Sequence, residues 1–119
     1  MANDCENRIR VFGEPEDVEA LADFVKSDDH PFDLDAVVPI STWPHARNGL
    51  PIEDIVAAWG TTRNVYCVDH SVDADQAFYS FYTAWQPPVP IVEALRKRFP
   101  NVLIQAFFDI PESEEAGYY

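Results

Sequence analysis

Strand-like and helix-like segments follow one another in a fixed order along this chain, and that order limits the folds it can form. From Asn7 to Gly13, apolar side chains alternate with arginines, which is the period of a half-buried strand. A helix is predicted from Glu14 to about Ser27, because Pro15 suits a first helical turn and apolar residues recur on one face. The chain therefore begins with a strand and a helix that can pack together.

The rest of the chain repeats this alternation. Several prolines interrupt the stretch from Asp28 to Gly49, so we expect a packed connection there and no long regular element. Further along, glycine and proline mark the ends of the patterned segments. The later predicted elements are a short helix from Pro51 to Trp59, strands from Asn64 to Val68 and from Ala77 to Thr83, a second long helix from about Pro90 to Arg98, and a final strand from Val102 to Asp109.

Strand, helix, strand, strand, helix, strand is the order of a ferredoxin-like βαββαβ sandwich. We therefore predict an α+β fold with a four-stranded antiparallel sheet in the spatial order 4-1-3-2. Both long helices would cover one face, and the short helix would precede the second strand. The polar segment from Asp69 to Asp75 would form a hairpin loop. Residues 1–119 suit a single domain, and we expect the acidic tail from about Pro111 to be loosely ordered.

The chain is strongly acidic. Twenty-one Asp and Glu residues oppose eight Lys and Arg, which gives a formal net charge of −13. Nucleic acids and anionic membranes are bound through Lys and Arg, so we expect no direct contact with DNA, RNA or a membrane. A basic protein partner is expected instead, and mutual repulsion favours a monomer. We find neither a signal peptide pattern nor a stretch of about 20 apolar residues, so we predict a cytoplasmic protein.

The acids are concentrated between Glu14 and Asp35. On the predicted first helix, Glu16, Glu19 and Asp23 follow the spacing of a solvent-exposed stripe. Because duplex DNA presents about one charge per 1.7 Å of its axis, carboxylates repeated at each helical turn can imitate a track of phosphates. The predicted partner-binding residues are Glu14, Glu16, Asp17, Glu19, Asp23, Asp28, Asp29, Asp33 and Asp35, joined by Asp73, Asp75 and Glu93.

Catalytic and metal-binding chemistry has little support. Cys67 and His70 are the one close pair of a nucleophile and a base in the sequence, and the abundance of acids removes the diagnostic value of carboxylate pairs. Asp69, Asp73 and Asp75 could hold a divalent cation weakly with His70, but a solvated hairpin loop explains the same residues. We therefore predict a non-enzymatic protein with no cofactor and no metal ion.

Two further features have structural and functional interpretations. Cys5 and Cys67 are too few and too far apart for a disulfide framework or a zinc motif, so we expect reduced, structural thiols. Trp85 with Pro87 and Pro88 could line an aromatic groove for a partner. Alternatively, the prolines only shape the connection between a strand and a helix.

Three blocks of sequence carry a family resemblance. They are Cys5-Glu6-Asn7-Arg8-Ile9 with Gly13, Trp59-Gly60-Thr61-Thr62-Arg63-Asn64, and Thr83-Ala84-Trp85-Gln86-Pro87-Pro88. Together they resemble the Api92/YubB-like family of ferredoxin-like domains, and the similarity extends over nearly the whole chain. Members are small proteins of phages, plasmids and integrated elements. The resemblance therefore implies the ferredoxin-like fold and a mobile-element setting, but no activity.

Charge and setting together predict an inhibitor of a host defence complex. The acidic surface would act as a DNA mimic that occupies the basic channel of a CRISPR effector or a restriction enzyme and excludes its DNA, an anti-CRISPR or anti-restriction role. The alternative is an acidic adaptor that binds another protein, with its charge serving solubility or adaptation to salt. Because Arg96, Lys97 and Arg98 lie on the second long helix, we expect the charge to be polarised between the two helices.

Overall fold

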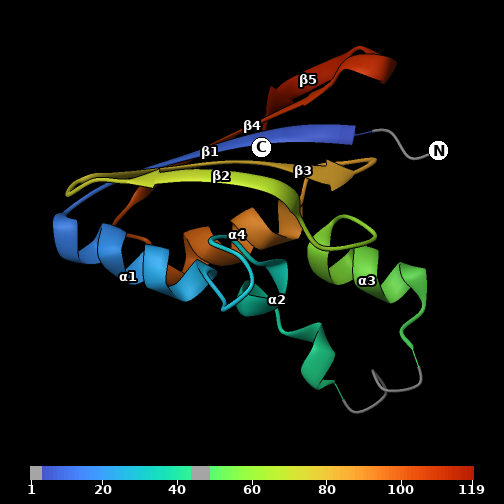
Figure 1. Cartoon of the computed structure of the whole chain (residues 1–119), viewed down its shortest axis with the longest axis horizontal. Coiled ribbons are helices and arrows are strands. Elements are labelled where there is room, and N and C mark those ends of the chain that lie inside the picture. Colours follow the sequence, from blue (N-terminus) through green and yellow to red (C-terminus); the bar gives the residue numbers. More distant parts are fainter. Residues whose placement is uncertain (1–3, 44–48) are drawn as a thin grey trace.

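In the described part of the chain, five antiparallel strands form one sheet, and the helices lie on one side of it (Figure 1). The computed structural model describes residues 4–43 and 49–119. Along the sheet the order is β2-β3-β1-β4-β5, so the first four strands follow the predicted 4-1-3-2 order read from the opposite edge. The strands are β1 Asp4–Phe12, β2 Tyr66–Val72, β3 Gln76–Ala84, β4 Leu103–Ile110 and β5 Glu115–Tyr118.

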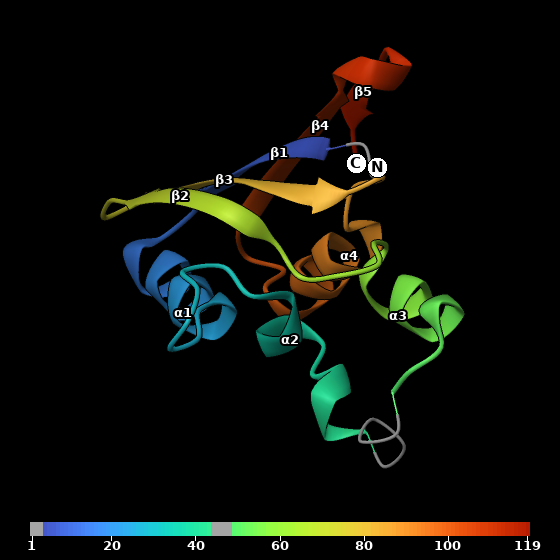
Figure 2. The same ribbon diagram turned by 45° about the vertical axis from the view of Figure 1, so that its right-hand side comes forward.

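Both long helices, α1 and α4, lie on the same face of the sheet, as predicted (Figures 1 and 2). Prolines stand at or beside the start of α1, α3 and α4, where a missing N–H leaves no helical hydrogen bond unmade. Gly60 ends α3 in the left-handed region with φ 82°, and its N–H donates to the Val56 carbonyl. The helices are α1 Pro15–Val25, α2 Leu34–Val37, α3 Ile52–Trp59 and α4 Val89–Arg98.

The core lies between the sheet and the helices. Ile9 and Val11 of β1 are buried under α1 and α4, whereas the alternating arginines of the same strand are exposed. Phe32, from the connection after α1, packs its ring 4.8 Å from Phe81 and 5.1 Å from Tyr79 of β3. This confirms a packed connection in its described part, while residues 44–48 lie outside the described residues.

A buried polar cluster joins β1, β3 and the residue after β5. The Asn7 side-chain amide donates to the Thr83 hydroxyl at 3.0 Å, and the Tyr119 hydroxyl donates to Asn7 Oδ1 at 2.8 Å. Cys5 lies beside this cluster and is fully buried. Burial raises the pKa of its thiol to about 11, so Cys5 is protonated and structural, as predicted. Cys67, in contrast, is exposed, and both cysteines are free thiols.

The prediction of a four-stranded sheet is wrong, because the tail from about residue 111, which we expected to be loosely ordered, folds back as β5. The Tyr118 ring packs edge-on against Phe107, with ring centroids 5.2 Å apart. The N–H of Tyr119 donates to the Ala106 carbonyl at 2.9 Å, and the Arg96 guanidinium donates to the Tyr119 carbonyl at 2.7 Å. These contacts add a strand at the β4 edge.

The predicted hairpin loop from Asp69 to Asp75 is also too long. Asp69 pairs with Ser80 and His70 with Tyr79, so the polar segment is mostly strand, and only residues 73–75 connect β2 to β3. A bulge interrupts the pairing between Tyr66 and Asp69. Its residue Cys67 has φ 54°. The His70 imidazole and the Ser71 hydroxyl are polar, as is typical of a loop. Both residues nevertheless occupy exposed positions on the edge strand β2.

Gly60→Ala and Gly49→Ala form a matched pair of substitutions, because both glycines have φ above 80° but only Gly60 is crowded. A Cβ at Gly60 would lie 2.7 Å from Pro90 Cδ, whereas a Cβ at Gly49 would meet nothing within 4 Å. We expect Gly60→Ala to lower the free energy of unfolding by about 1–3 kcal/mol more than Gly49→Ala does, measured by urea denaturation. Equal losses at the two positions would contradict the close packing of α3 against the turn before α4.

Candidate functional site

Most of the predicted acidic residues are exposed. Glu16 and Glu19 project from α1, and Asp17 is half-buried. Asp23 lies 3.0 Å from Lys26 Nζ, but both side chains are mostly exposed, so this ion pair is weak. The other exposed members of the predicted set are Glu14 before α1, Asp28 and Asp29 after it, Asp73 and Asp75 in the β2–β3 turn, and Glu93 on α4.

The β2–β3 turn brings two of these acids to the start of α1. The Gly13 N–H donates to the Asp75 carbonyl at 3.1 Å, and Gly13 directly precedes Glu14. The turn lies beside the first turn of α1 in both views (Figures 1 and 2). Further along, Glu19 and Asp23 line a shallow groove that His70 and Val72 of β2 complete. We call this surface the acidic edge; it comprises Glu14, Glu16, Asp17, Glu19, Asp23, Asp73 and Asp75.

Asp33 and Asp35 serve the fold. Asp33 is 8% exposed and caps α2, accepting hydrogen bonds from the Asp35 N–H at 2.8 Å and the Asn64 amide at 2.7 Å. The Asp35 carboxylate accepts the N–H of Ser41 at 3.1 Å. Burial raises the pKa of Asp33, but contacts with Ser27, Asn64 and the Asp35 N–H outweigh it, so its pKa lies below the ordinary 3.8. These two carboxylates therefore hold the connection after α1 in place.

At the end of α4, a basic side chain extends to α1. The Arg98 guanidinium lies 4.2 Å from the ring centroid of Phe24, which belongs to α1. Arg96 reaches the other way and donates to the Ile104 carbonyl at 2.9 Å. Arg98 thus contacts α1 and Arg96 contacts the sheet, while Lys97 is exposed.

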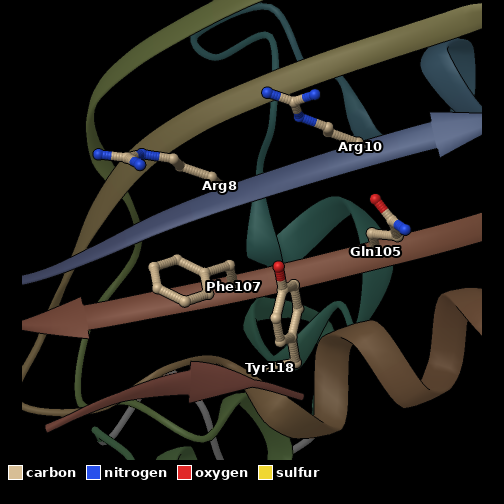
Figure 3. Close-up of a pocket in the computed structure, with 5 residues that line it drawn as sticks. All are labelled: Arg8, Arg10, Gln105, Phe107 and Tyr118. Atoms are coloured by element: carbon tan, nitrogen blue, oxygen red, sulfur yellow. The ribbon is translucent and has the colours of Figure 1, made fainter.

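The sheet face opposite the helices carries a second candidate site, which sequence analysis did not select. Five side chains from β1, β4 and β5 surround a hollow of about 370 Å³ on this face (Figure 3). The strand period that buries Ile9 and Val11 necessarily turns their neighbours Arg8 and Arg10 outward, and this signal could have found the basic part of the site. We call it the sheet site; its residues are Arg8, Arg10, Gln105, Phe107 and Tyr118.

Strand register aligns these side chains in two rows. Arg10 lies between Phe78 of β3 and Gln105 of β4, and its guanidinium carbon is 5.6 Å from the Phe78 ring centroid. In the next row Arg8 is opposite Phe107, which in turn is opposite Tyr118. A basic group and an aromatic surface are therefore adjacent on one open face.

The two arginines differ in their electrostatic surroundings. Arg8 donates through Nε and Nη2 to Glu6 Oε1, at 3.1 and 3.0 Å, so its charge is partly neutralised. Within residues 4–43 and 49–119, no carboxylate oxygen lies within 4.0 Å of the Arg10 guanidinium. Glu6 itself is opposite Asp109 in the register. The positive end of the sheet site is thus Arg10, and the negative end lies beyond Arg8.

Other sequence candidates lie outside both surfaces. Trp59 is buried and donates its indole N–H to the Val38 carbonyl at 2.9 Å, so it is a core residue. Trp85 is 51% exposed with φ 73°, in a tight turn closed by a 2.9 Å hydrogen bond from the Gln86 N–H to the Ala84 carbonyl. Pro88 is buried, so it cannot share an exposed groove with Trp85.

No metal centre is evident in the described part of the chain, where no three His, Cys, Asp or Glu side chains are grouped to hold an ion. The His70 ring lies beside Tyr79, with centroids 6.4 Å apart, while Cys67 occupies the bulge. Among the described helices, none has the length and apolar character needed to cross a bilayer. Comparisons with protein-family models, curated proteins and solved structures give no match to this chain.

Asp33→Ala and Asp28→Ala test the division between structural and exposed acids. We expect Asp33→Ala to lower the free energy of unfolding by about 1–2 kcal/mol at pH 7, because it removes a helix cap, and Asp28→Ala to change it by less than about 0.5 kcal/mol. Since the folded pKa of Asp33 is lowered, its contribution is present above the ordinary 3.8 and is lost as the pH falls through the folded value.

Chemical denaturation between neutral and acidic pH measures this contribution. The difference between Asp33→Ala and the unsubstituted protein should shrink as Asp33 becomes protonated. A difference that stays constant down to the acid limit of folding would show that the Asp33 charge does not stabilise the cap.

Proposed function

We propose that this chain is a non-enzymatic protein whose acidic edge binds the basic nucleic-acid-binding surface of another protein and competes with DNA. The observation that carries the proposal is the hydrogen bond from Gly13 to Asp75, which places the β2–β3 turn beside α1. Carboxylates from two segments far apart in the sequence thereby contribute to one surface. A basic channel is the partner that such a surface complements.

The charge density of the acidic edge supports this proposal. With a rise of about 1.5 Å per residue, Glu16, Glu19 and Asp23 cover about 10 Å of α1, or about one carboxylate per 5 Å. A single DNA strand carries about one phosphate per 3.4 Å of axis. The helix alone is therefore sparser than DNA, and the additional acids at its start bring the density closer to that of a phosphate track.

The target class that we propose is a CRISPR effector or a restriction enzyme. The protein would bind it as a monomer in the cytoplasm of the host. The family resemblance supports this choice, because it implies a mobile-element setting. The strand order β2-β3-β1-β4 with both long helices on one face supports a ferredoxin-like fold, to which β5 is an addition. An adaptor role is the second candidate, favoured by the half-buried Phe107 and the exposed Tyr118 on the other face.

Charge reversal on the acidic edge provides the direct test. The double variant Glu16→Lys with Glu19→Lys should reduce competition with DNA by about tenfold or more, since like charges then face the basic partner. The matched control is Glu53→Lys with Glu112→Lys, which changes the net charge by the same amount. Glu53 lies in the first turn of α3, as Glu16 lies in the first turn of α1. DNA binding by a panel of purified CRISPR effectors and restriction enzymes, with and without each variant, measures the effect.

The outcomes separate the proposed roles. Competition should also weaken as ionic strength rises, because salt screens exposed charges. Equal loss in both double variants would indicate dependence on net charge and not on the acidic edge. Absence of competition across the panel, together with loss of the fold as salt is removed, would identify the acids as an adaptation to salt.

A further inference from the structure

The sheet site has the size and composition of a small-ligand site. Its volume of about 370 Å³ lies within the range of about 300–1,000 Å³ that is usual for ligand pockets. Figure 3 shows its five side chains on the face of the sheet turned away from the helices, with strand backbone beneath them. Regular strands hold these positions, so the arrangement is in place before a ligand arrives.

The chemistry of these side chains matches a phosphate joined to a flat aromatic group. Arg10 offers a guanidinium that can donate two hydrogen bonds to a phosphate, and within the described residues no carboxylate oxygen lies within 4.0 Å of it. Phe107 and Tyr118 offer aromatic surface, and Tyr118 is 78% exposed. The Gln105 amide, in the same row as Arg10, can donate a further hydrogen bond to a phosphate.

We propose that the sheet site binds a free nucleotide, with the phosphate at Arg10 and the base against Phe107 and Tyr118. Register determines this orientation. Glu6 and Asp109 are paired across β1 and β4 at the far end of the site, where they repel a phosphate. The row that contains Arg10 and Gln105 is therefore the phosphate end.

The same surroundings select a single nucleotide over a nucleic-acid strand. Only two arginines line the sheet site, and Arg8 is already engaged by Glu6. A longer strand would carry further phosphates toward Glu6 and Asp109 and across a protein of net charge −13. Each additional phosphate would thus meet carboxylates and not arginines, whereas one nucleotide needs only the Arg10 end.

The nucleotide site is separate from the α1 part of the acidic edge. The sheet site lies on the face opposite α1 (Figures 1 and 3), and no residue belongs to both surfaces, although Arg10 and Asp73 of the acidic edge line a neighbouring hollow together. Loss of DNA competition in the α1 variants would leave nucleotide binding intact. The reverse also holds, so each proposal can fail alone.

Calorimetric titration with AMP, GMP, CMP and UMP tests the site. We expect saturable binding of at least one of them and about tenfold or greater weakening in Arg10→Gln, since a charged hydrogen bond to phosphate is lost. The control Lys97→Gln removes one positive charge from an exposed position on α4, on the other side of the sheet. It should leave the affinity for the nucleotide within about twofold of that of the unsubstituted protein. Far-ultraviolet circular dichroism and thermal unfolding of each variant establish that the fold is retained.

Two further arms separate the parts of the proposal. Tyr118→Leu keeps an apolar side chain on β5 but removes the ring, so it should weaken nucleotide binding and leave binding of inorganic phosphate unchanged. Inorganic phosphate that binds as tightly as every nucleotide would overturn the role of the aromatic surface. No saturable nucleotide binding, equal weakening by Lys97→Gln, or tighter binding of a single-stranded deoxythymidine decamer than of any mononucleotide would overturn the proposed site.

Discussion

The alternation of side chains along β1 is the constraint on which the rest of the structure depends. This strand pairs with β3 on one side and β4 on the other. The alternation of its side chains therefore determines which side chains of both neighbouring strands point toward the helices. Ile9 and Val11 then meet the helices, while Arg8 and Arg10 face away from them. A slip of one residue would bury two guanidinium groups and expose two core side chains, so the register is strongly specified.

Local periodicity was enough to predict most of the elements but not those that depend on distant contacts. The helices α1, α3 and α4 and the strand β4 lie within a few residues of their predicted positions. The strand β5 was missed because its order comes from Tyr118 against Phe107 and from Tyr119 hydrogen-bonded to Asn7. No pattern within the segment itself carries that information.

The candidate surfaces show the same limit. Asp28 and Asp33 are the same residue type in one acidic stretch, yet the first is exposed and the second caps α2 beneath Asn64. Composition cannot distinguish them, since the difference depends on tertiary packing. The sheet site was missed because Arg10 and Tyr118 are distant in the sequence and come to line one site only through two strand pairings. The sequence could predict that most acidic residues are exposed. It could not predict which side chains from distant segments come together in one site.

The two edges of the sheet have a consequence for how this protein meets other molecules. At one edge, β2 is interrupted by the bulge at Cys67. At the other, β5 has only four residues and begins with Glu115. Bulged, short or charged edges are poor templates for a further strand. Backbone pairing with a foreign strand or with another copy is therefore disfavoured at both edges, which favours recognition through side chains on the faces and on α1.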